Sequence, residues 1–388
     1  MRIALLTNIL SPYRKSFFDE LHSELVERNI EFKVFVMANS EKNRTWEYNE
    51  FKACYTELLA YKTINISNFQ IHLNRNFKKR LLEFRPDILI SSGSYLLPAV
   101  LTSIKLRSSL RYKLLFWSES HLDEERGYNR LIYALRHCLR MCIYQRFDGF
   151  WYAGEKSLEF IKRYCSSESV FHFVPNLINQ KDFYKANDLR RDKTNLRISR
   201  GIPEDRFVLI CPARLSHVKG LLPFLRLFSQ CKTKFTTTLL IAGDGELRDE
   251  LQSFIDSHDL DVRLLGHQSQ DEMIRLYALA DAFLLPSLSD PNPLSCIEAI
   301  WAGLPLFVSR HVGNYPEIVS QGENGYVFSY QNPDEAIALL DTLASSDSKW
   351  LANASKVSLS VATSIYNSEV AVKHLVESMI KDLRGERQ

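Results

Sequence analysis

The stretch Asp281–Gly303, DAFLLPSLSDPNPLSCIEAIWAG, organises the rest of the chain. It begins with a short apolar run, 282–285, of the length and composition of a buried parallel strand. A proline-rich loop carrying Asp290 follows, and Ser295 is placed to cap a helix that contains Glu298. Loops that follow parallel strands are where open α/β sheets bind ligands. The stretch therefore predicts a strand–loop–helix unit with two candidate binding carboxylates, although two surface acids on an ordinary connection are the alternative.

Strand-like and helix-like segments alternate along most of the chain, which predicts parallel sheets with right-handed crossovers. A length of 388 residues is long for one hydrophobic core, so we expect two domains. The polar stretch 178–203 marks their boundary, near residue 185. We predict an α/β protein with two Rossmann-like domains, 1–185 and 186–362, facing each other across a cleft. A C-terminal helix in 363–388 is expected to pack back toward the first domain.

The composition is that of a soluble globular protein, with 45% hydrophobic and 24% charged residues and no apolar run near the ~20 residues that span a bilayer. The N-terminal residues 1–7 predict a first strand rather than a signal peptide. Seven scattered cysteines without a C-x-x-C pair indicate neither a zinc site nor a disulfide framework. A net charge of +3 does not indicate a nucleic-acid partner. We therefore expect a reduced, cytoplasmic α/β protein.

Polar and small residues follow the predicted strands of the second half. Arg214 and Lys219 come after the strand 206–211, in a loop that begins a helix. Cations beside a helix N-terminus suit a phosphate or a diphosphate. Two glycines after the strand 237–242 allow a close backbone approach to a ligand, although a tight turn is the simpler interpretation. The further candidates at these strand ends are Gly243, Gly245, His267 and Gln268.

Six motifs in this order carry a family resemblance: PARLSHVKG, IAGDGELRDEL, VRLLGHQSQDEMIRLYALADAFLLPS, D-x7-E, IEAIWAGLPLFVS and EIVSQGENGYVF. Together they resemble the nucleotide-sugar half of the retaining glycosyltransferases of family 4, which have the GT-B fold. The resemblance is strong over 204–330. It is looser in the first half, where SPYR, ESH, DGFWYAGEKS and VPN carry it.

The resemblance implies a role for each matching residue. Arg214 and Lys219 match the pair that neutralises the donor diphosphate, on which charge builds as the glycosidic bond breaks. Glu298 matches the glutamate that accepts hydrogen bonds from both ribose hydroxyls. Asp290 stands where the family usually has a glutamate that contacts the donor sugar, and it is one methylene shorter. Further donor contacts are implied for Gly243, Gly245, His267, Gln268, Pro293, Leu294 and Ser295. Because the cation pair can replace a divalent metal, no metal and no cofactor are expected.

In the first half, the resemblance implies that His121 lies near the donor sugar and acts with Arg214, Lys219 and Asp290 in catalysis. A solvent-side loop histidine is the alternative. The residues expected on the acceptor side or in the cleft are Ser11, Tyr13, Arg14 and Glu119. A front-face reaction is implied, in which the donor phosphate oxygen takes the acceptor proton. The loop that leads to Arg14 lacks the glycines found in many relatives, which leaves its role open.

The function implied is retaining transfer of a sugar from a nucleotide-diphosphate donor to a hydroxyl of a glycan or polyprenyl-linked acceptor, in surface polysaccharide biosynthesis. Two alternatives stay open. The first is an enzyme of the same fold that epimerises or hydrolyses a nucleotide sugar. The second is a nucleotide-sugar-binding scaffold that has lost turnover, an alternative that Asp290 and the missing glycines keep open.

The predicted helix 127–146 is amphipathic. Its apolar arc, predicted to be core, contains Leu131, Leu135, Cys138, Leu139, Cys142 and Ile143. A second arc contains Arg130, Tyr133, Arg136, His137, Arg140 and Tyr144. This basic arc is either a solvated face or a surface for anionic lipid head groups or a polyprenyl diphosphate. In the second case the protein is peripheral on the cytoplasmic face of a membrane.

Overall fold

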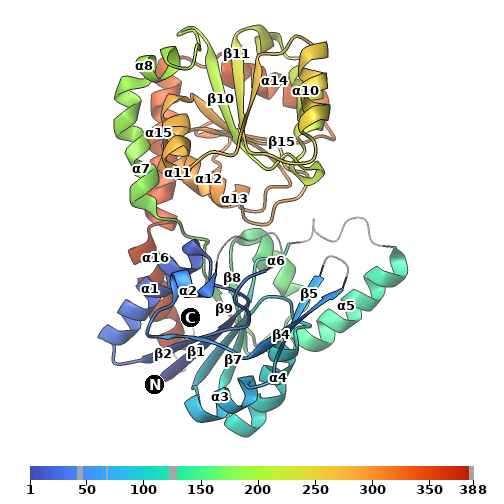
Figure 1. The fold of residues 1–388 in the computed structure, drawn as a ribbon, viewed down its shortest axis with the longest axis vertical. Coiled ribbons are helices and arrows are strands. Elements are labelled where there is room, and N and C mark those ends of the chain that lie inside the picture. Colours follow the sequence, from blue (N-terminus) through green and yellow to red (C-terminus); the bar gives the residue numbers. More distant parts are fainter. Residues whose placement is uncertain (42–46, 67–68, 122–128, 384–388) are drawn as a thin grey trace. The chain divides into compact units, whose positions relative to one another are not determined.

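A computed structural model of the chain describes residues 1–41, 47–66, 69–121 and 129–383. The chain divides into two compact units, Met1–Leu177 with Ser368–Gln388, and Ile178–Asn367 (Figure 1). Each unit is built on one open parallel sheet with helices packed on it. The predicted α/β architecture with two Rossmann-like domains is confirmed.

The described residues of the first unit form a seven-stranded parallel sheet with the order β3-β2-β1-β6-β7-β8-β9. Its strands are β1 (Arg2–Thr7), β2 (Glu31–Val36), β3 (Thr56–Leu58), β6 (Ile88–Ser92), β7 (Lys113–Ser118), β8 (Gly149–Tyr152) and β9 (Val170–Phe173). Strand β1 pairs with both β2 and β6, so the winding of the chain reverses there. The loops after β1 and β6 therefore lie next to each other at the carboxyl edge, where open α/β sheets bind ligands.

Alternate residues of these strands face opposite helix layers, as the two-residue period of a strand requires. Phe116 belongs to a core with residues of α3 and α4, whereas the neighbouring Trp117 packs edge-to-face on Phe17 of α1. The helices are α1 (Pro12–Glu27), α2 (Tyr48–Phe51), α3 (Phe77–Phe84), α4 (Pro98–Leu110), α5 (Arg130–Tyr144), α6 (Glu155–Lys162) and α16 (Ser368–Leu383). An antiparallel hairpin, β4 (Tyr61–Ile66) and β5 (Phe69–Asn74), completes the described part of this unit.

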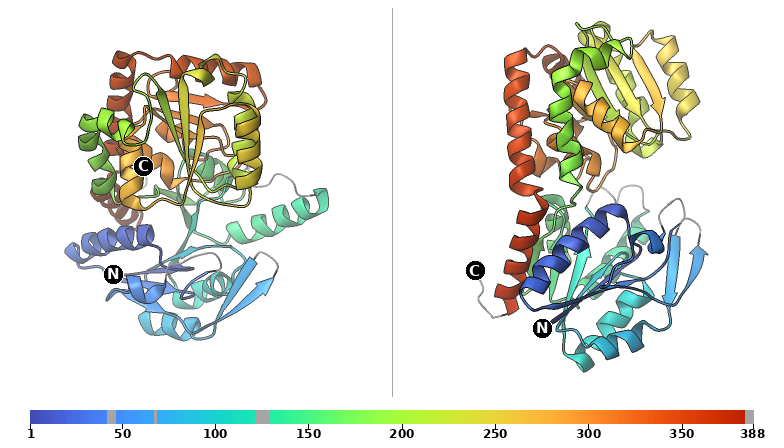
Figure 2. Two further views of the ribbon diagram at one scale, coloured as in Figure 1. Left: turned by 45° about the horizontal axis from the view of Figure 1, so that its top comes forward. Right: turned by 60° about the vertical axis from the view of Figure 1, so that its left-hand side comes forward.

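Helix α16 comes from the end of the chain and packs on α1 and β9 (Figure 2, right). The ring of His172 on β9 is buried between two of its side chains. Its Nδ1 lies 2.8 Å from the Ser378 hydroxyl, and its Nε2 lies 3.2 Å from the Asp382 carboxylate. Burial lowers the pKa of His172, although the Asp382 carboxylate opposes that shift. The C-terminal helix is thus held to the first sheet by polar contacts as well as by its apolar face.

The described residues of the second unit form a six-stranded parallel sheet with the order β12-β11-β10-β13-β14-β15. Its strands are β10 (Phe207–Pro212), β11 (Thr237–Ala242), β12 (Val262–Gly266), β13 (Ala282–Leu285), β14 (Leu306–Ser309) and β15 (Gly325–Phe328). Its helices are α7 (Gln180–Leu189), α8 (Lys193–Ile198), α9 (Leu221–Phe228), α10 (Arg248–Ser257), α11 (Gln270–Leu279), α12 (Leu294–Trp301), α13 (Tyr315–Ile318), α14 (Pro333–Ala344) and α15 (Ser348–Ile365). Strand β10 pairs with β11 and β13, so the winding reverses beside the stretch 281–303.

The predicted domain boundary near residue 185 is wrong, because that residue lies inside α7 and the division falls after Leu177. Helix α7 packs on α11 and α12. Polar side chains of α7 and of its C-cap, which resemble those of a linker, donate hydrogen bonds to backbone carbonyls at the end of α12. Asn187 donates to the Trp301 carbonyl at 2.9 Å, and Arg190 donates to the Ala302 carbonyl at 2.7 Å. The second unit also extends past residue 362, since α15 continues to Ile365.

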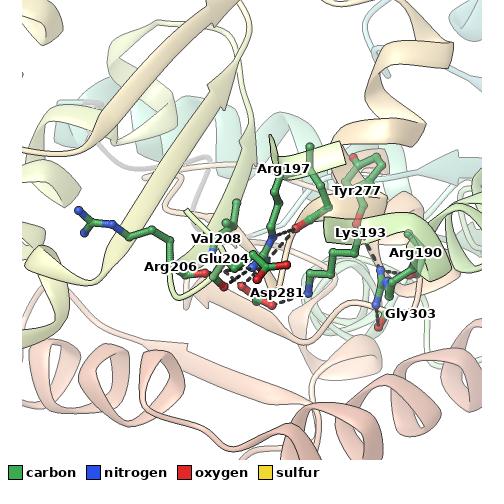
Figure 3. A network of polar contacts seen from close by, with 11 residues as sticks. Arg190, Lys193, Arg197, Glu204, Arg206, Val208, Tyr277, Asp281 and Gly303 are labelled. Carbon is green, nitrogen blue, oxygen red and sulfur yellow. Dashed lines mark hydrogen bonds and ion pairs between the residues drawn. The ribbon is translucent and has the colours of Figure 1, made fainter. Parts of the chain in front are cut away.

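Two cations after α7 bind one carboxylate in a polar network, and a third, Arg190, binds backbone carbonyls beside them (Figure 3). Asp281, at the start of β13, accepts from Lys193 at 2.5 Å and from Arg197 at 2.6 Å. The Val208 N–H of β10 donates to the same carboxylate at 2.7 Å. Burial lowers the pKa of Arg190 to about 10 and also lowers the pKa of Lys193. This network fastens the segment between α7 and β10 to the middle of the second sheet.

The prediction that the apolar arc of α5 is core is wrong, because the helix buries residues of its basic arc instead. Its apolar arc is exposed, with Leu131 at 83% and Leu135 at 62% of full exposure. The buried positions are Arg140 and Tyr144 of the basic arc. The Arg140 guanidinium lies 4.7 Å from the ring centre of Phe160, and two tyrosine rings surround it as well. The basic arc is therefore packed against aromatic rings, because cation–π contacts stabilise an arginine that an apolar pattern alone would leave in water.

Among the described helices, none combines the length and the apolar character of a membrane-spanning segment.

Candidate functional site

The loop after β10 carries the two cations predicted to bind a diphosphate. Arg214 is exposed, and its guanidinium forms no hydrogen bond or ion pair with any other described residue. Lys219 ends a short 3-10 helix, His217–Lys219, just before α9. Its amino group lies 2.5 Å from Oδ2 of Asp290, in the loop after β13. The structure thus brings together two of the predicted site residues from neighbouring strand ends.

The Lys219–Asp290 ion pair is largely shielded from water, with the two side chains 24% and 12% exposed. The Ser287 hydroxyl also donates to Oδ2 of Asp290, at 3.4 Å. An ion pair that is mostly withdrawn from solvent is screened less than a surface pair, so the aspartate holds the lysine in one position. The amino group remains a charged donor at the carboxyl edge of the sheet.

The loop 286–293 is fastened to the loop after β14 by its backbone. The Asp290 N–H donates to the His311 carbonyl at 3.2 Å, and the Gly313 N–H donates to the Asp290 carbonyl at 2.7 Å. Asn314 then donates to the Pro293 carbonyl at 3.2 Å. These contacts set the position of the Asp290 side chain. The sequence analysis did not predict these roles of Gly313 and Asn314. The signal that the sequence offers is a glycine, Gly313, after a predicted strand.

Gly313→Ala is expected to lower the free energy of unfolding by about 3 kcal/mol, because a core without space must shift to accept a methyl group. A Cβ at Gly313 would lie 1.6 Å from the carbonyl oxygen of Pro291. Urea denaturation measures the loss, and nucleotide affinity should fall with it. Gly201→Ala is the control, because its new Cβ meets nothing within 4 Å and only its left-handed φ of +60° costs stability. Equal losses and unchanged nucleotide affinity in both variants would contradict this role of Gly313.

Glu298 lies in α12, where the buried Tyr277 of α11 donates a hydrogen bond to its Oε2 at 2.7 Å. This contact orients the carboxylate, and the sequence showed no sign of it. The predicted cap is wrong, since α12 begins at Leu294 and Ser295 is its second residue. Pro293 takes the cap position, because its fixed φ suits the entry to a helix even without a side-chain bond.

The thiol of Cys296 on α12 is buried near charged groups of this site. Burial raises its pKa first, and the carboxylates of Asp290 and Glu298 raise it further, whereas Lys219 lowers it. Three of the predicted donor-site charges, Lys219, Asp290 and Glu298, are therefore within electrostatic reach of one side chain of α12.

Gly243 and Gly245 follow β11 and pack against the loop that carries Arg214. A Cβ on Gly243 would lie 2.1 Å from the Ala213 carbonyl oxygen, and one on Gly245 would lie 2.5 Å from that of Leu215. Only glycine allows the two strand-end loops to lie this close. His267 is exposed after β12, and the Gln268 amide donates to the Leu265 carbonyl at 2.8 Å. These predicted donor contacts share the carboxyl edge with Arg214.

The strand-end loops of the first unit hold a separate polar cluster around Arg14. Its guanidinium donates to the Thr7 hydroxyl at 3.1 Å, lies 3.5 Å from the Glu119 carboxylate and stacks 4.4 Å from the ring centre of Trp117. Ser11 caps α1 by accepting from the Arg14 N–H at 3.3 Å. The predicted acceptor-side residues Arg14 and Glu119 are thus in contact.

Tyr13 and His121 are the remaining residues predicted in the first unit. Tyr13 is half-buried in the first turn of α1, and His121 is buried after β7. In the described residues, no group of three or more His, Cys, Asp or Glu side chains is arranged to hold a metal ion. The independence from metal and the catalytic role of His121 stay predictions.

Residues 192–356 match the family model described as glycosyl transferases group 1. Over these residues the chain is similar to that family. The match includes the Lys219–Asp290 pair and Glu298, so the resemblance seen in the motifs is confirmed where the site lies.

Two curated relatives match about the same part of the chain. An uncharacterized glycosyltransferase of Methanocaldococcus jannaschii is 32% identical over 43% of this chain and 43% of its own length. Alpha-monoglucosyldiacylglycerol synthase of Acholeplasma laidlawii is 30% identical over 42% of this chain and 41% of its own length. The chain thus spans less than half the length of these relatives.

The likeness to solved structures extends over the whole fold. Anabaena Alr3699/HepE, solved in complex with UDP-glucose, covers 98% of this chain and 100% of its own, with a TM-score of 0.71 and 18% identity. The chain has the GT-B fold, as predicted from its six motifs.

Proposed function

We propose that the protein is a retaining glycosyltransferase that moves a sugar from a nucleotide-diphosphate donor to a hydroxyl of a glycan or lipid-linked acceptor. The observation that carries the proposal is the Lys219–Asp290 ion pair at the carboxyl edge of the second sheet, with Glu298 on the helix that follows the loop of Asp290. Two relatives support it, one named as a glucosyldiacylglycerol synthase and one solved with UDP-glucose. Surface polysaccharide assembly is the setting we propose.

In this proposal, Arg214 and Lys219 bind the diphosphate, and Glu298 accepts hydrogen bonds from the ribose hydroxyls. The acceptor oxygen attacks the anomeric carbon on the face that the leaving group vacates. The bond between that carbon and the diphosphate oxygen breaks, and the acceptor proton passes to the phosphate. Fixed cations stabilise the charge that develops on the leaving diphosphate, which lowers the barrier without a metal ion.

Asp290 has two roles in this proposal, since it holds Lys219 in place and contacts the donor sugar. Its side chain is shorter by one methylene than the glutamate that the family resemblance implies at this position, so its reach toward a sugar is smaller. The ion pair with Lys219 uses one of its oxygens. The other acceptor positions of the carboxylate remain suited to a sugar hydroxyl.

The test is the thermal stability of the full chain with UDP, GDP, ADP, dTDP or CMP, each with and without magnesium. A ligand present at about 100 times its dissociation constant stabilises the folded state by ~2.7 kcal/mol, which raises the melting temperature measurably. We expect one diphosphate to raise it without magnesium. No rise with any nucleotide would contradict the donor site and favour a scaffold that no longer binds a nucleotide.

With the nucleotide known, product analysis separates transfer from the alternatives. Incubation with the sugar donor and candidate acceptors should give a glycoside whose anomeric configuration, measured by NMR, equals that of the donor. A free sugar or an epimerised donor as the main product would instead indicate a hydrolase or an epimerase, and inverted configuration would contradict retention.

A further inference from the structure

The exposed apolar face of α5 goes beyond the proposed function and does not depend on it. Leu131, Leu135 and Leu139 lie one helical turn apart, at 83%, 62% and 38% of full exposure. Ile132 beside them is 44% exposed, and the thiols of Cys138 and Cys142 on the same side are also exposed. Large apolar side chains gathered on one exposed stripe mark an interaction surface, whereas single ones do not.

The opposite side of α5 already has its partners within the first unit. Arg140 lies among Tyr95, Phe160 and Tyr164, and the His137 ring packs edge-to-face on Tyr164 at 5.1 Å. Tyr144 is buried as well. The helix therefore cannot rotate to bury its leucines without removing a buried arginine from its ring contacts. Figure 1 shows α5 at one side of the first unit.

The charged residues of α5 indicate which kind of surface the leucine face contacts. Helix α5 contains arginines and no Asp or Glu. Exposed arginines stand at its first residue, Arg130, and two residues past its end, Arg146. If two copies of α5 packed face to face, arginines would meet with no carboxylate on the helix to pair with them. An anionic lipid surface is complementary to this pattern, because leucines enter the acyl boundary while arginines reach the phosphates.

We infer that α5 is an in-plane membrane anchor, which inserts Leu131, Leu135 and Leu139 into the interface of a bilayer rich in anionic lipid. With 15 residues, α5 is shorter than the ~20 that span a bilayer, so it lies in the interface. This differs from the lipid contact predicted from the sequence, because the apolar arc binds the lipid, whereas Arg140 and Tyr144 of the basic arc are buried in the protein.

The test is sedimentation of the full chain with vesicles made of equal parts of phosphatidylcholine and phosphatidylglycerol. The double variant Leu131→Glu/Leu135→Glu should lower the partition coefficient about tenfold or more, because it removes two leucines from the inserted face. The matched control is Ile198→Glu/Phe235→Glu in the second unit, where the side chains are 62% and 70% exposed. That control adds the same charge away from α5 and should bind the vesicles like the unmodified protein.

Two further measurements distinguish a lipid surface from a second copy of the protein as the partner of the leucine face. Arg130→Gln/Arg146→Gln should reduce the salt dependence of binding to anionic vesicles. Sedimentation velocity reports self-association. Vesicle binding by the leucine variant equal to that of the control would overturn the inference. So would a dimer of the unmodified protein that the leucine variant converts to a monomer, since a second copy would then cover this face. Circular dichroism of each variant shows that it is folded, and none of these measurements requires glycosyl transfer.

Discussion

Lys219→Ala is expected to lower kcat/KM for the nucleotide-sugar donor by about 10²–10³, the loss typical when one fixed donor to a developing negative charge is removed. The lysine amino group is held 2.5 Å from Asp290 and is largely shielded from water. Such a preorganised charge requires no rearrangement when the diphosphate leaves, so its removal should affect the chemical step more than donor binding. Steady-state kinetics with the donor identified by thermal stability measures both parameters.

Lys181→Ala serves as the control for Lys219→Ala, because Lys181 is an exposed lysine on α7. Its replacement should leave kcat and KM unchanged. Activity of Lys219→Ala within a few-fold of the unmodified protein would refute the assignment of this lysine to the diphosphate. A rise in KM alone would instead mean that Lys219 binds donor and transition state equally.

The stretch 281–303 shows how far sequence patterns reach. The apolar run 282–285 is the whole of β13, and the proline-rich segment is a loop, as predicted. Strand length and proline chemistry are local properties, so a short window contains them. The cap of α12 was predicted wrongly because serine favours cap positions on average, whereas here the loop contacts of Asp290 and Pro293 set where the helix begins.

Predictions that depend on distant partners were less complete. Glu298 was found from its motif, but Tyr277, which orients it, lies in another helix that nothing in the motif specifies. The pairing of Lys219 with Asp290 depends on two loops meeting at neighbouring strands, which only the strand order reveals. Spacing along the chain proposed candidate residues for the site, whereas the contacts among them come from the tertiary structure.

Helix α5 was predicted with the wrong face inside, for a general reason. A period of 3.6 residues shows that a helix has two faces, but it does not show which one meets the protein. Arg140 is buried by aromatic rings from other elements, and those rings are not near it in sequence. The domain boundary was misplaced by the same kind of error, since Arg190 looks like a linker residue and is buried among carbonyl oxygens.

Asp281→Ala is expected to destabilise the second unit by about 3–5 kcal/mol, the cost of removing one partner from a buried ion pair. Asp281 and Arg197 are 9% and 7% exposed, and Lys193 shares the same carboxylate (Figure 3). Without Asp281 these cations keep their burial but lose the charge that offsets it, and the Val208 N–H loses its acceptor. Urea denaturation of the full chain, followed by circular dichroism, measures the change.

The control for Asp281→Ala lies in the same region of the chain. Asp188 pairs with Arg191 at 3.7 Å, but their side chains are 69% and 85% exposed. Asp188→Ala should therefore cost less than about 1 kcal/mol, since solvent already screens this pair. Hydrogen exchange should show the loss of protection in peptides from α7, α8 and β13 for Asp281→Ala alone. Equal losses of stability in the two variants would mean that Lys193 and Arg197 bind other groups when Asp281 is absent. The Asp281 network would then not be what holds the segment after α7 to the second sheet.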